Sequence, residues 1–392
     1  MPADPPTHVV IEPLAAQRML AGTMRSGRVE VVDGGDLARV TADPGDDVQV
    51  VHANRFEDVV PGDGLVCVVV DGEIRCYAPD PVDLTVLPER ADIFDRVRGV
   101  FETDVLRDRS VAVLGLGSGG SVILRELARC GVGRFLLVDH DRLEIGNVSR
   151  HECGLSDVGR LKTNAARDLV LDRNPAAEIA AMTLKIDGDT IDELAAAIET
   201  FDVDLVVCAT DNRASRLLVN RLCVLAGLPA LYAGVFRRAY GGQVLRYVPG
   251  LSPCYQCFVS ALPMMATDQE ISSETVASAI AYSDRIVAVE PGLAADIAPV
   301  ALLVAKLALQ EVLGDTASTL ASLNEDLVAP LYLWLNRREA NTEYATLAPL
   351  ATGVDQMSVL RWYGIGLARA VDCPACGDFA ADLDTSAFAL RK

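Results

Sequence analysis

Residues 110–131 read SVAVLGLGSGGSVILRELARCG, and this stretch decides the fold class. Residues 110–117 form an apolar run that enters a glycine turn, which is typical of a buried β-strand. Residues 121–131 have the apolar spacing of an amphipathic helix and finish in Gly131, a residue type that favours helix ends. The stretch therefore predicts a strand, a tight turn and a helix in direct succession.

The turn itself carries a phosphate-binding pattern. Gly115, Gly117 and Gly120 fit G-x-G-x-x-G between a predicted strand and a predicted helix, the context in which this pattern has meaning. Backbone N–H groups and the helix N-terminus can then approach phosphate oxygens closely. Asp139 ends the next apolar run, where a carboxylate can accept a hydrogen bond from a ribose hydroxyl. We expect a nucleotide site, and these residues alone do not distinguish ATP from NAD.

Outward from this turn, apolar strands alternate with helices. Strands are expected at 134–139, 178–183, 204–210 and 229–235, and helices at 160–173 and 213–226. This alternation predicts an α/β fold with a Rossmann-like, mostly parallel sheet that has helices on both faces. After residue 240 the expected segments are an apolar run at 242–248, a polar loop, a long helix at about 291–313 and a β-like run at 331–337.

The first 90 residues have a different texture. The runs LVCVVV and EIRCYA flank Asp71-Gly72, and Asp-Gly between two such runs is a strong hairpin signal. Pro79, Pro81 and Pro88 then indicate a linker. We therefore expect a small β-rich accessory domain at 1–90, a candidate substrate clamp by its position. A nucleotide-binding domain at 91–376 and a C-terminal tail at 377–392 follow.

Charge and hydropathy limit the partners. The chain has 35 Lys and Arg against 55 Asp and Glu, a net charge of −20 that repels polyphosphate backbones, so nucleic acid binding is disfavoured. ATP stays open, because a local basic pocket can override the global sign. Asp296, Pro299, Lys306 and Gln310 interrupt the most apolar stretch, 292–313, so we expect a buried helix there and no membrane span. The first twenty residues lack a signal-peptide pattern, so we expect a cytoplasmic protein with reduced cysteines.

Three later residues favour phosphate chemistry over a nicotinamide. Arg150 can bridge phosphate oxygens with its forked guanidinium, and Lys162 can add a point charge. Asp211 follows a predicted strand, at the edge where α/β sheets bind ligands, and its carboxylate suits Mg²⁺. Fixed cations stabilise the negative charge that nucleotidyl transfer builds on the α-phosphate and on pyrophosphate. A NAD(P)-dependent oxidoreductase, which has no such need, remains an alternative function.

Two C-x-x-C pairs predict a metal site. They are Cys254, Cys257, Cys373 and Cys376. Four thiolates complete the tetrahedral shell of a structural Zn²⁺, and such a zinc ribbon would tie the end of the chain to its middle. A redox role for the pairs is the alternative. For His151 we favour a structural hydrogen bond over acid–base chemistry, and for Cys153 a structural role over exposure at the nucleotide.

Five segments of the chain together resemble a known family. GLGSGGS, LVDHD, GNVSRH, GRLK and CATDN, in this order and spacing, resemble the ThiF/MoeB/HesA family, which includes the adenylation domain of ubiquitin-activating enzymes. The similarity covers residues 91–315, and the zinc ribbon extends it to 376. It implies an ATP-dependent adenylyltransferase that activates a C-terminal carboxylate as an acyl-AMP and releases pyrophosphate. The substrate would be a small ubiquitin-like protein, a sulfur-carrier protein or a precursor peptide.

The resemblance also assigns site residues. The positions implied to bind ATP are Gly115, Gly117, Gly120, Asp139, Asp141, Asn147, Arg150, Lys162, Asp211 and Asn212. Of these, Arg150, Lys162 and Asp211 are implied to be catalytic, with Asp211 organising Mg²⁺. Family members usually act as homodimers in which an arginine near the N-terminus enters the partner's site. Arg96 or Arg98 could fill that role here.

The segment expected to cross over the site, 258–290, contains no cysteine. In ubiquitin-type activators and some ThiF proteins, a cysteine in this segment forms a covalent intermediate with the carrier. Its absence favours an enzyme that passes on the acyl-adenylate itself. A non-catalytic, partner-binding member of the fold is a further alternative.

Overall fold

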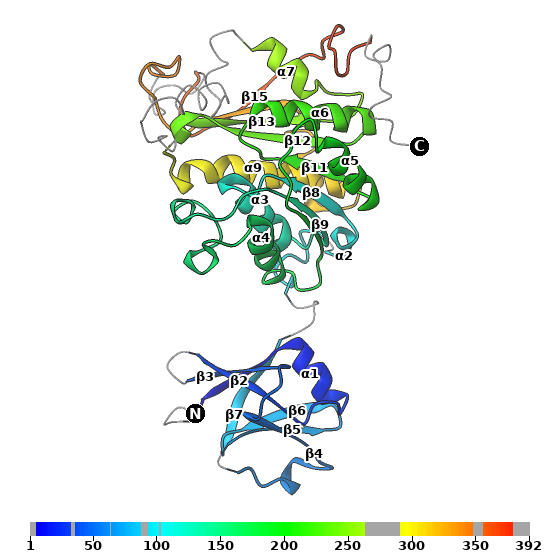
Figure 1. Cartoon of the computed structure of the whole chain (residues 1–392), viewed down its shortest axis with the longest axis vertical. Helices are drawn as coiled ribbons and strands as arrows, with labels where there is room; N and C mark the ends of the chain where they lie inside the picture. Colours follow the sequence, from blue (N-terminus) through cyan, green and yellow to red (C-terminus); the bar gives the residue numbers. More distant parts are fainter. Residues whose placement is uncertain are drawn as a thin grey trace. The chain divides into compact units, whose positions relative to one another are not determined.

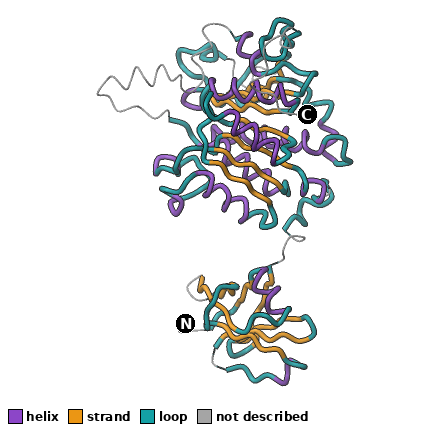
Figure 2. The backbone as a smooth tube through the Cα atoms, turned by 45° about the vertical axis from the view of Figure 1, so that its right-hand side comes forward, coloured by secondary structure: helices purple, strands orange, loops and turns teal. Residues whose placement is uncertain are grey.

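The structure is a computed structural model of the chain. It describes residues 5–32, 36–62, 64–87, 93–101, 103–262, 291–347 and 356–378. The chain divides into two compact units, Met1–Ile93 and Phe94–Lys392 (Figures 1 and 2). The predicted boundary at residue 90 lies close to this division.

The first unit is a small closed β-barrel. Its elements are β1 (His8–Ile11), α1 (Pro13–Leu20), β2 (Ser26–Val32), β3 (Leu37–Thr41), β4 (Val48–His52), β5 (Leu65–Val70), β6 (Glu73–Tyr77) and β7 (Pro81–Val86). The strands follow the order β1-β3-β2-β4-β5-β6-β7, and β7 pairs with β1 to close the barrel. The predicted hairpin is present as β5 and β6, with Asp71 and Gly72 at positive φ in the turn. Cys67 and Cys76 face each other across it in the barrel core.

The predicted proline linker is wrong over its first part. Pro81 begins β7, which pairs in parallel with β1 from Asp83 to Val86. Proline lacks an N–H but is tolerated as the first residue of a strand, where its ladder bond is not needed. The prolines alone therefore could not distinguish a strand start from a linker.

The second unit is built on one eight-stranded sheet. Its strands are β8 (Ser110–Leu114), β9 (Arg134–Val138), β10 (Glu178–Met182), β11 (Leu205–Cys208), β12 (Ala230–Val235), β13 (Gly241–Tyr247), β14 (Leu331–Leu335) and β15 (Trp362–Ile365). Its helices are α2 (Asp104–Arg107), α3 (Ser118–Arg129), α4 (Lys162–Leu171), α5 (Ile191–Thr200), α6 (Arg213–Ala226), α7 (Tyr255–Ala261) and α9 (Ala294–Leu313). Helices α1, α2, α5 and α7 had no counterpart among the expected elements.

The sheet is mixed, and the predicted parallel pairing holds for the larger part of it. The order is β10-β9-β8-β11-β12-β13-β14-β15, with parallel pairing from β10 to β12 and antiparallel pairing from β12 to β15. The chain runs outward from β8 to β10 and then returns to β11 on the other side of β8. The topological switch point, where α/β sheets bind ligands, therefore lies between the carboxyl ends of β8 and β11.

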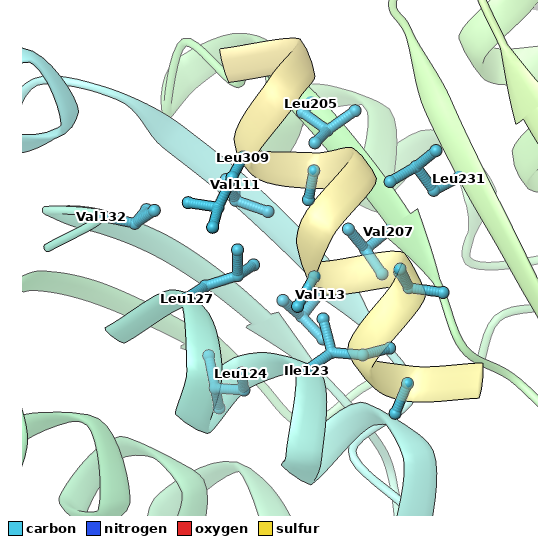
Figure 3. Packing of buried hydrophobic residues seen from close by; sticks show 14 of the residues in the cluster. Val111, Val113, Ile123, Leu124, Leu127, Val132, Leu205, Val207, Leu231 and Leu309 are labelled. Atoms are coloured by element: carbon cyan, nitrogen blue, oxygen red, sulfur yellow. The ribbon is translucent and has the colours of Figure 1, made fainter. Parts of the chain in front are cut away.

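Helices cover both faces of this sheet, and successive side chains of each strand point to opposite faces. Val111 and Val113 point to the face covered by α3, α4 and α9, and Ala112 and Leu114 point to the face covered by α5 and α6. Figure 3 shows Leu124 of α3 among the side chains packed between α3, α9 and the strands. The long predicted helix is α9, and it lies in this core. Among the described residues, we find no helix that combines the length and apolarity needed to cross a membrane.

We expect the Leu124→Ala variant to lower the free energy of unfolding of the second unit by about 2–5 kcal/mol, because Leu124 is fully buried and truncation leaves a cavity. Both tryptophans, Trp334 and Trp362, lie in this unit, so their fluorescence during urea unfolding reports on it alone. Leu302→Ala on α9 is the matched control, because Leu302 is 47% exposed, and its effect should stay within about 0.5 kcal/mol. Equal losses in the two variants would contradict this assignment of the core.

Candidate functional site

The glycine loop after β8 lies against the loop after β11. A Cβ atom on Gly115 would lie 2.8 Å from the carbonyl carbon of Ala209, and Gly115 has a φ of +89°. A Cβ on Gly120 would lie 1.9 Å from the Gly115 carbonyl oxygen, whereas a Cβ on Gly117 would meet no atom within 4 Å. Gly115 and Gly120 therefore allow the tight turn, and Gly117 faces open space at the N-terminus of α3. That is the arrangement in which backbone N–H groups can receive a phosphate.

Asp139 braces this loop. Its carboxylate is buried at the end of β9 and accepts two backbone hydrogen bonds, from Leu116 N at 2.7 Å and from Asp141 N at 2.9 Å. Asp139 thus ties the end of β9 to the glycine loop. Sequence reasoning predicted a ribose contact for Asp139 but not this bracing role.

His151 holds the same loop from the other side. Its Nε2 lies 2.8 Å from the Leu116 carbonyl oxygen, and its Nδ1 accepts a hydrogen bond from Cys153 N at 2.9 Å. The ring is therefore neutral, with its proton on Nε2, and both nitrogens are used by the backbone. This agrees with the predicted structural role. Cys153 is buried as well, and burial raises the pKa of its thiol to about 11.

Lys162 and Asp141 form an ion pair at this edge of the sheet. Lys162 is buried at the first position of α4, and its Nζ lies 2.8 Å from Asp141 Oδ2. Partial burial alone would raise the pKa of Asp141, but the hydrogen bond and charge of Lys162, with a smaller contribution from His140, hold that pKa below its ordinary value. The Lys162 ammonium is therefore held in place beside the glycine loop, next to a helix N-terminus that adds positive potential.

Asn147 and Arg150 lie on one turn of chain. Asn147 Oδ1 accepts a hydrogen bond from Glu144 N at 3.0 Å, and the Asn147 carbonyl accepts from Arg150 N at 2.9 Å. The Arg150 side chain is half-buried, and its Nη1 lies 3.7 Å from where a Cβ on Gly292 would stand. Arg150 thus lies beside the residues that lead into α9.

Asp211 and Asn212 lie in the loop between β11 and α6. Asp211 is exposed, and Asn212 caps α6 by accepting a hydrogen bond from Ser215 N at 2.8 Å. Arg216 was missed by the sequence reasoning. It is buried and donates to the Thr210 carbonyl, from Nε at 3.0 Å and from Nη2 at 2.5 Å, so it holds the loop that carries Asp211. No local pattern marked it, because its partner is a backbone carbonyl.

The four predicted cysteines come together. Three of the Sγ–Sγ distances are 3.9 Å for Cys254–Cys257, 3.7 Å for Cys254–Cys373 and 3.5 Å for Cys257–Cys376. A tetrahedron of sulfurs about 2.3 Å from a central ion has edges of about 3.8 Å. The cluster is therefore compatible with a four-thiolate metal site. Asn220 supports it, donating from Nδ2 to Cys254 Sγ and accepting from Tyr255 N.

Two further predictions concern residues away from the glycine loop. Arg96 and Arg98 follow Phe94, which lies 3.8 Å from where a Cβ on Gly131 would stand, at the far end of α3 from the glycine loop. Within one chain, neither arginine therefore lies near its own glycine loop. The predicted crossover segment 258–290 begins inside α7, and its residues from 263 onward lie outside the described part of the chain.

Comparison with known proteins identifies the family. A model of the ThiF family matches residues 91–342, well over half of the chain. The chain belongs to the ThiF family. All the described site residues of this ThiF chain lie within the matched range, apart from Cys373 and Cys376.

Curated relatives and solved structures are consistent with this. The ubiquitin-like modifier-activating enzyme 5 of Dictyostelium discoideum is 34% identical over 161 residues, which are 39% of this chain and 42% of that protein. The enzyme of the same name from Caenorhabditis briggsae is 31% identical over 183 residues, 45% of this chain and 41% of that protein. The ThiF chain thus spans less than half the length of these relatives. E. coli MccB, in a structure with MccA-N7isoASN, has a similar fold, with 21% identity, a TM-score of 0.50 and coverage of 70% of this chain and 69% of its own.

The environment of His151 gives the stability of the second unit a pH dependence. Burial lowers the pKa of His151 below its ordinary value of 6.5, and the charge of Lys162 acts in the same direction, while the bond to Leu116 opposes them. The folded state therefore favours the neutral ring. His151 contributes stability that is complete above the unfolded pKa and is lost progressively as the pH falls from there towards the folded pKa.

Between pH 7.5 and 5.5, we expect the unfolding free energy to fall by up to about 1 kcal/mol more in the wild type than in His151→Gln. Glutamine can still donate to the Leu116 carbonyl but does not titrate, so it removes this contribution and leaves the other acid-sensitive groups unchanged. Urea unfolding followed by tryptophan fluorescence at each pH measures the difference. The same pH dependence in both proteins would show that His151 does not titrate on unfolding.

Proposed function

We propose that this chain is an ATP- and Mg²⁺-dependent adenylyltransferase that converts a C-terminal carboxylate into an acyl-AMP and releases pyrophosphate. The observation that carries the proposal is the convergence of glycine loop, ribose-side carboxylate and cations at the switch point of the sheet. Gly117 lies on the loop after β8, Asp139 follows β9, Lys162 begins α4, and Asp211 lies on the loop after β11. Membership of the ThiF family supports the same reading.

Each group has a place in the proposed site. Asp139 would accept a hydrogen bond from the ribose, and the N-terminus of α3 beside Gly117 would receive phosphate oxygens. Arg150 and Lys162 would bind the phosphates, and Asp141 holds the Lys162 ammonium in position before they arrive. Asp211 would hold Mg²⁺, which when bound offsets charge on the phosphates.

The proposed step is an in-line substitution at the α-phosphorus. A carboxylate oxygen of the substrate forms the new bond to the α-phosphorus. The bond between the α-phosphorus and the oxygen that bridges the α- and β-phosphates breaks, and its electron pair leaves with pyrophosphate. The charge balances without proton transfer, so no general base is needed. This fits His151, whose ring nitrogens are both engaged by the backbone. The residues therefore act by position and charge.

The proposed acyl substrate is the C-terminal carboxylate of a ubiquitin-like protein, a sulfur-carrier protein or a peptide. The names of the curated relatives, ubiquitin-like modifier-activating enzymes, support a protein tail. All ten cysteines lie in the described residues, and eight of them are buried. Of the other two, Cys376 belongs to the cysteine cluster, and burial raises the pKa of Cys130 to about 11. We therefore propose that the acyl-adenylate is passed on without a thioester on this chain.

We further propose that the chain acts as a cytoplasmic homodimer. Arg96 and Arg98 lie at the far end of α3, and neither is near the glycine loop of its own chain. This position supports the hypothesis that one of them enters the site of a partner subunit. The role of a substrate clamp for the barrel stays a prediction.

Lys162→Ala should lower ATP–pyrophosphate exchange at least about 100-fold, because the phosphates lose a prepositioned cation. Asp211→Asn should have an effect of similar size if Asp211 holds Mg²⁺. Exchange is measured with a panel of peptides and small proteins that end in free carboxylates. Arg167→Ala is the matched control, since Arg167 lies on the same helix as Lys162 but is exposed, and exchange should change less than about twofold. Exchange that survives both site substitutions, or tight binding of NAD(P)H in place of ATP, would reject the proposal.

For the cysteine cluster we propose a structural Zn²⁺ held by all four thiolates. The sulfur spacing and the burial of Cys254, Cys257 and Cys373 support a closed site with no open position for chemistry. Such a site adds folding free energy, because the ligands come together only in the folded chain.

We expect about one zinc per chain in the purified protein and close to none in Cys373→Ser, measured by elemental analysis. The variant should also unfold at a lower urea concentration by tryptophan fluorescence. Cys130→Ser is the control, because Cys130 lies on the other side of the unit's core and should keep its zinc. Full zinc content in Cys373→Ser would show that this residue is not a ligand.

A further inference from the structure

The turn between β12 and β13 has an unusual backbone. Arg238 and Ala239 follow each other with φ values of 55° and 52°, in the left-handed region that residues with a Cβ rarely adopt. Two such residues in succession store strain, which persists only where the surroundings hold the conformation. The turn must therefore have a partner that fixes it.

That partner is the pair Asn336 and Arg337, directly after β14. Asn336 Nδ2 donates to the Ala239 carbonyl at 2.8 Å, and Asn336 N donates to the Tyr240 carbonyl at 2.8 Å. Arg337 donates to the Arg238 carbonyl from Nη2. The carbonyls of three successive residues, including both left-handed ones, are thus held by two neighbouring residues.

The same two side chains also hold the start of α9. Asn336 Nδ2 donates to the Asp296 carbonyl at 2.8 Å, and Arg337 Nη1 lies 2.5 Å from Asp296 Oδ2. Glu339 completes the network by accepting from Arg337 Nε at 3.1 Å. We call Asn336 and Arg337 the clamp, because they join the β12–β13 turn to the first turn of α9.

The two clamped segments meet beside Arg150. A Cβ on Gly292, two residues before α9, would lie 3.2 Å from Ala239 Cβ and 3.7 Å from Arg150 Nη1. The turn also follows β12, the parallel neighbour of the strand that leads to Asp211. The clamp therefore fixes the wall of the site next to Arg150, on the side of Asp211 away from the glycine loop.

We propose that Asn336 and Arg337 are positioning residues that act through Arg150. By holding the turn and the start of α9, they keep Ala239 and Gly292 as a rigid wall against which the Arg150 guanidinium is oriented. This inference rests on the proposed function for the role of Arg150 at the phosphates. It assigns a part in the site to residues of the antiparallel half of the sheet.

A double-mutant cycle tests this. Arg337→Lys keeps the charge but loses the forked geometry, and we expect it to lower ATP–pyrophosphate exchange about tenfold or more. In an Arg150→Ala background, the same change should cost less than about twofold, because the residue through which it acts is gone. Additive losses would overturn the proposal. Arg338→Lys is the matched control, since the Arg338 side chain donates to the Leu347 carbonyl.

A rescue variant separates positioning from general stability. Glycine adopts positive φ without strain, so Ala239→Gly should recover at least part of the exchange lost in Arg337→Lys. Recovery of stability without recovery of exchange would count against the proposal. If Arg337→Lys does not fold, Asn336→Asp takes its place in the cycle, because it removes the amide donor at similar volume.

Calorimetric titration with MgATP repeats the cycle as a binding measurement. If the effects of Arg337→Lys and Arg150→Ala on ATP affinity are coupled, the clamp is supported. If at the same time no carboxylate substrate gives exchange, only the proposed function is rejected. Exchange in the wild type together with additive effects in both measurements would reject the clamp alone.

Discussion

The backbone contact between Gly115 and the Ala209–Thr210 peptide is the constraint on which the rest of the site depends. A side chain at residue 115 would stand 2.8 Å from the Ala209 carbonyl carbon and 2.9 Å from Thr210 N, so only glycine lets the two loops touch. The contact lies at the switch point between β8 and β11, where the chain reverses its direction across the sheet. Phosphate loop and Asp211 loop therefore share one wall, and neither can shift without the other.

Leu116, next to Gly115, links this contact to the charged groups of the site. Its N–H is held by Asp139 and its carbonyl by His151, so both polar groups of one buried residue are fixed by side chains. Arg150 precedes His151 directly, and the loop after Asp139 carries the carboxylate that holds Lys162. The hydrogen bonds that shape the glycine loop therefore also help to position Arg150 and Lys162.

Sequence reasoning succeeded where a function needs a local pattern. Apolar runs indicate the buried strands around Gly115. The spacing of the cysteine pairs indicates the metal site, because each short segment supplies two ligands of a tetrahedral shell. It failed where the partner is a distant backbone carbonyl. Arg216 and Arg337 look like ordinary arginines in the sequence, and only the fold brings them to the carbonyls of Thr210 and Arg238. Such contacts leave no periodicity and no spacing to detect.

The strongly acidic composition raises the question of how this edge of the sheet can receive an anion. The structure answers it by pairing acidic groups close to the site. Asp139 is satisfied by two backbone N–H groups, Asp141 by Lys162 and Asp296 by Arg337. Charges farther away than about 8 Å are largely screened at physiological ionic strength, so the remaining negative surface contributes little at the glycine loop. The sign of the electrostatic potential at the glycine loop is set by groups within hydrogen-bond distance. The net charge of the chain therefore argues against a polyanion that binds along the whole surface, but not against a single nucleotide.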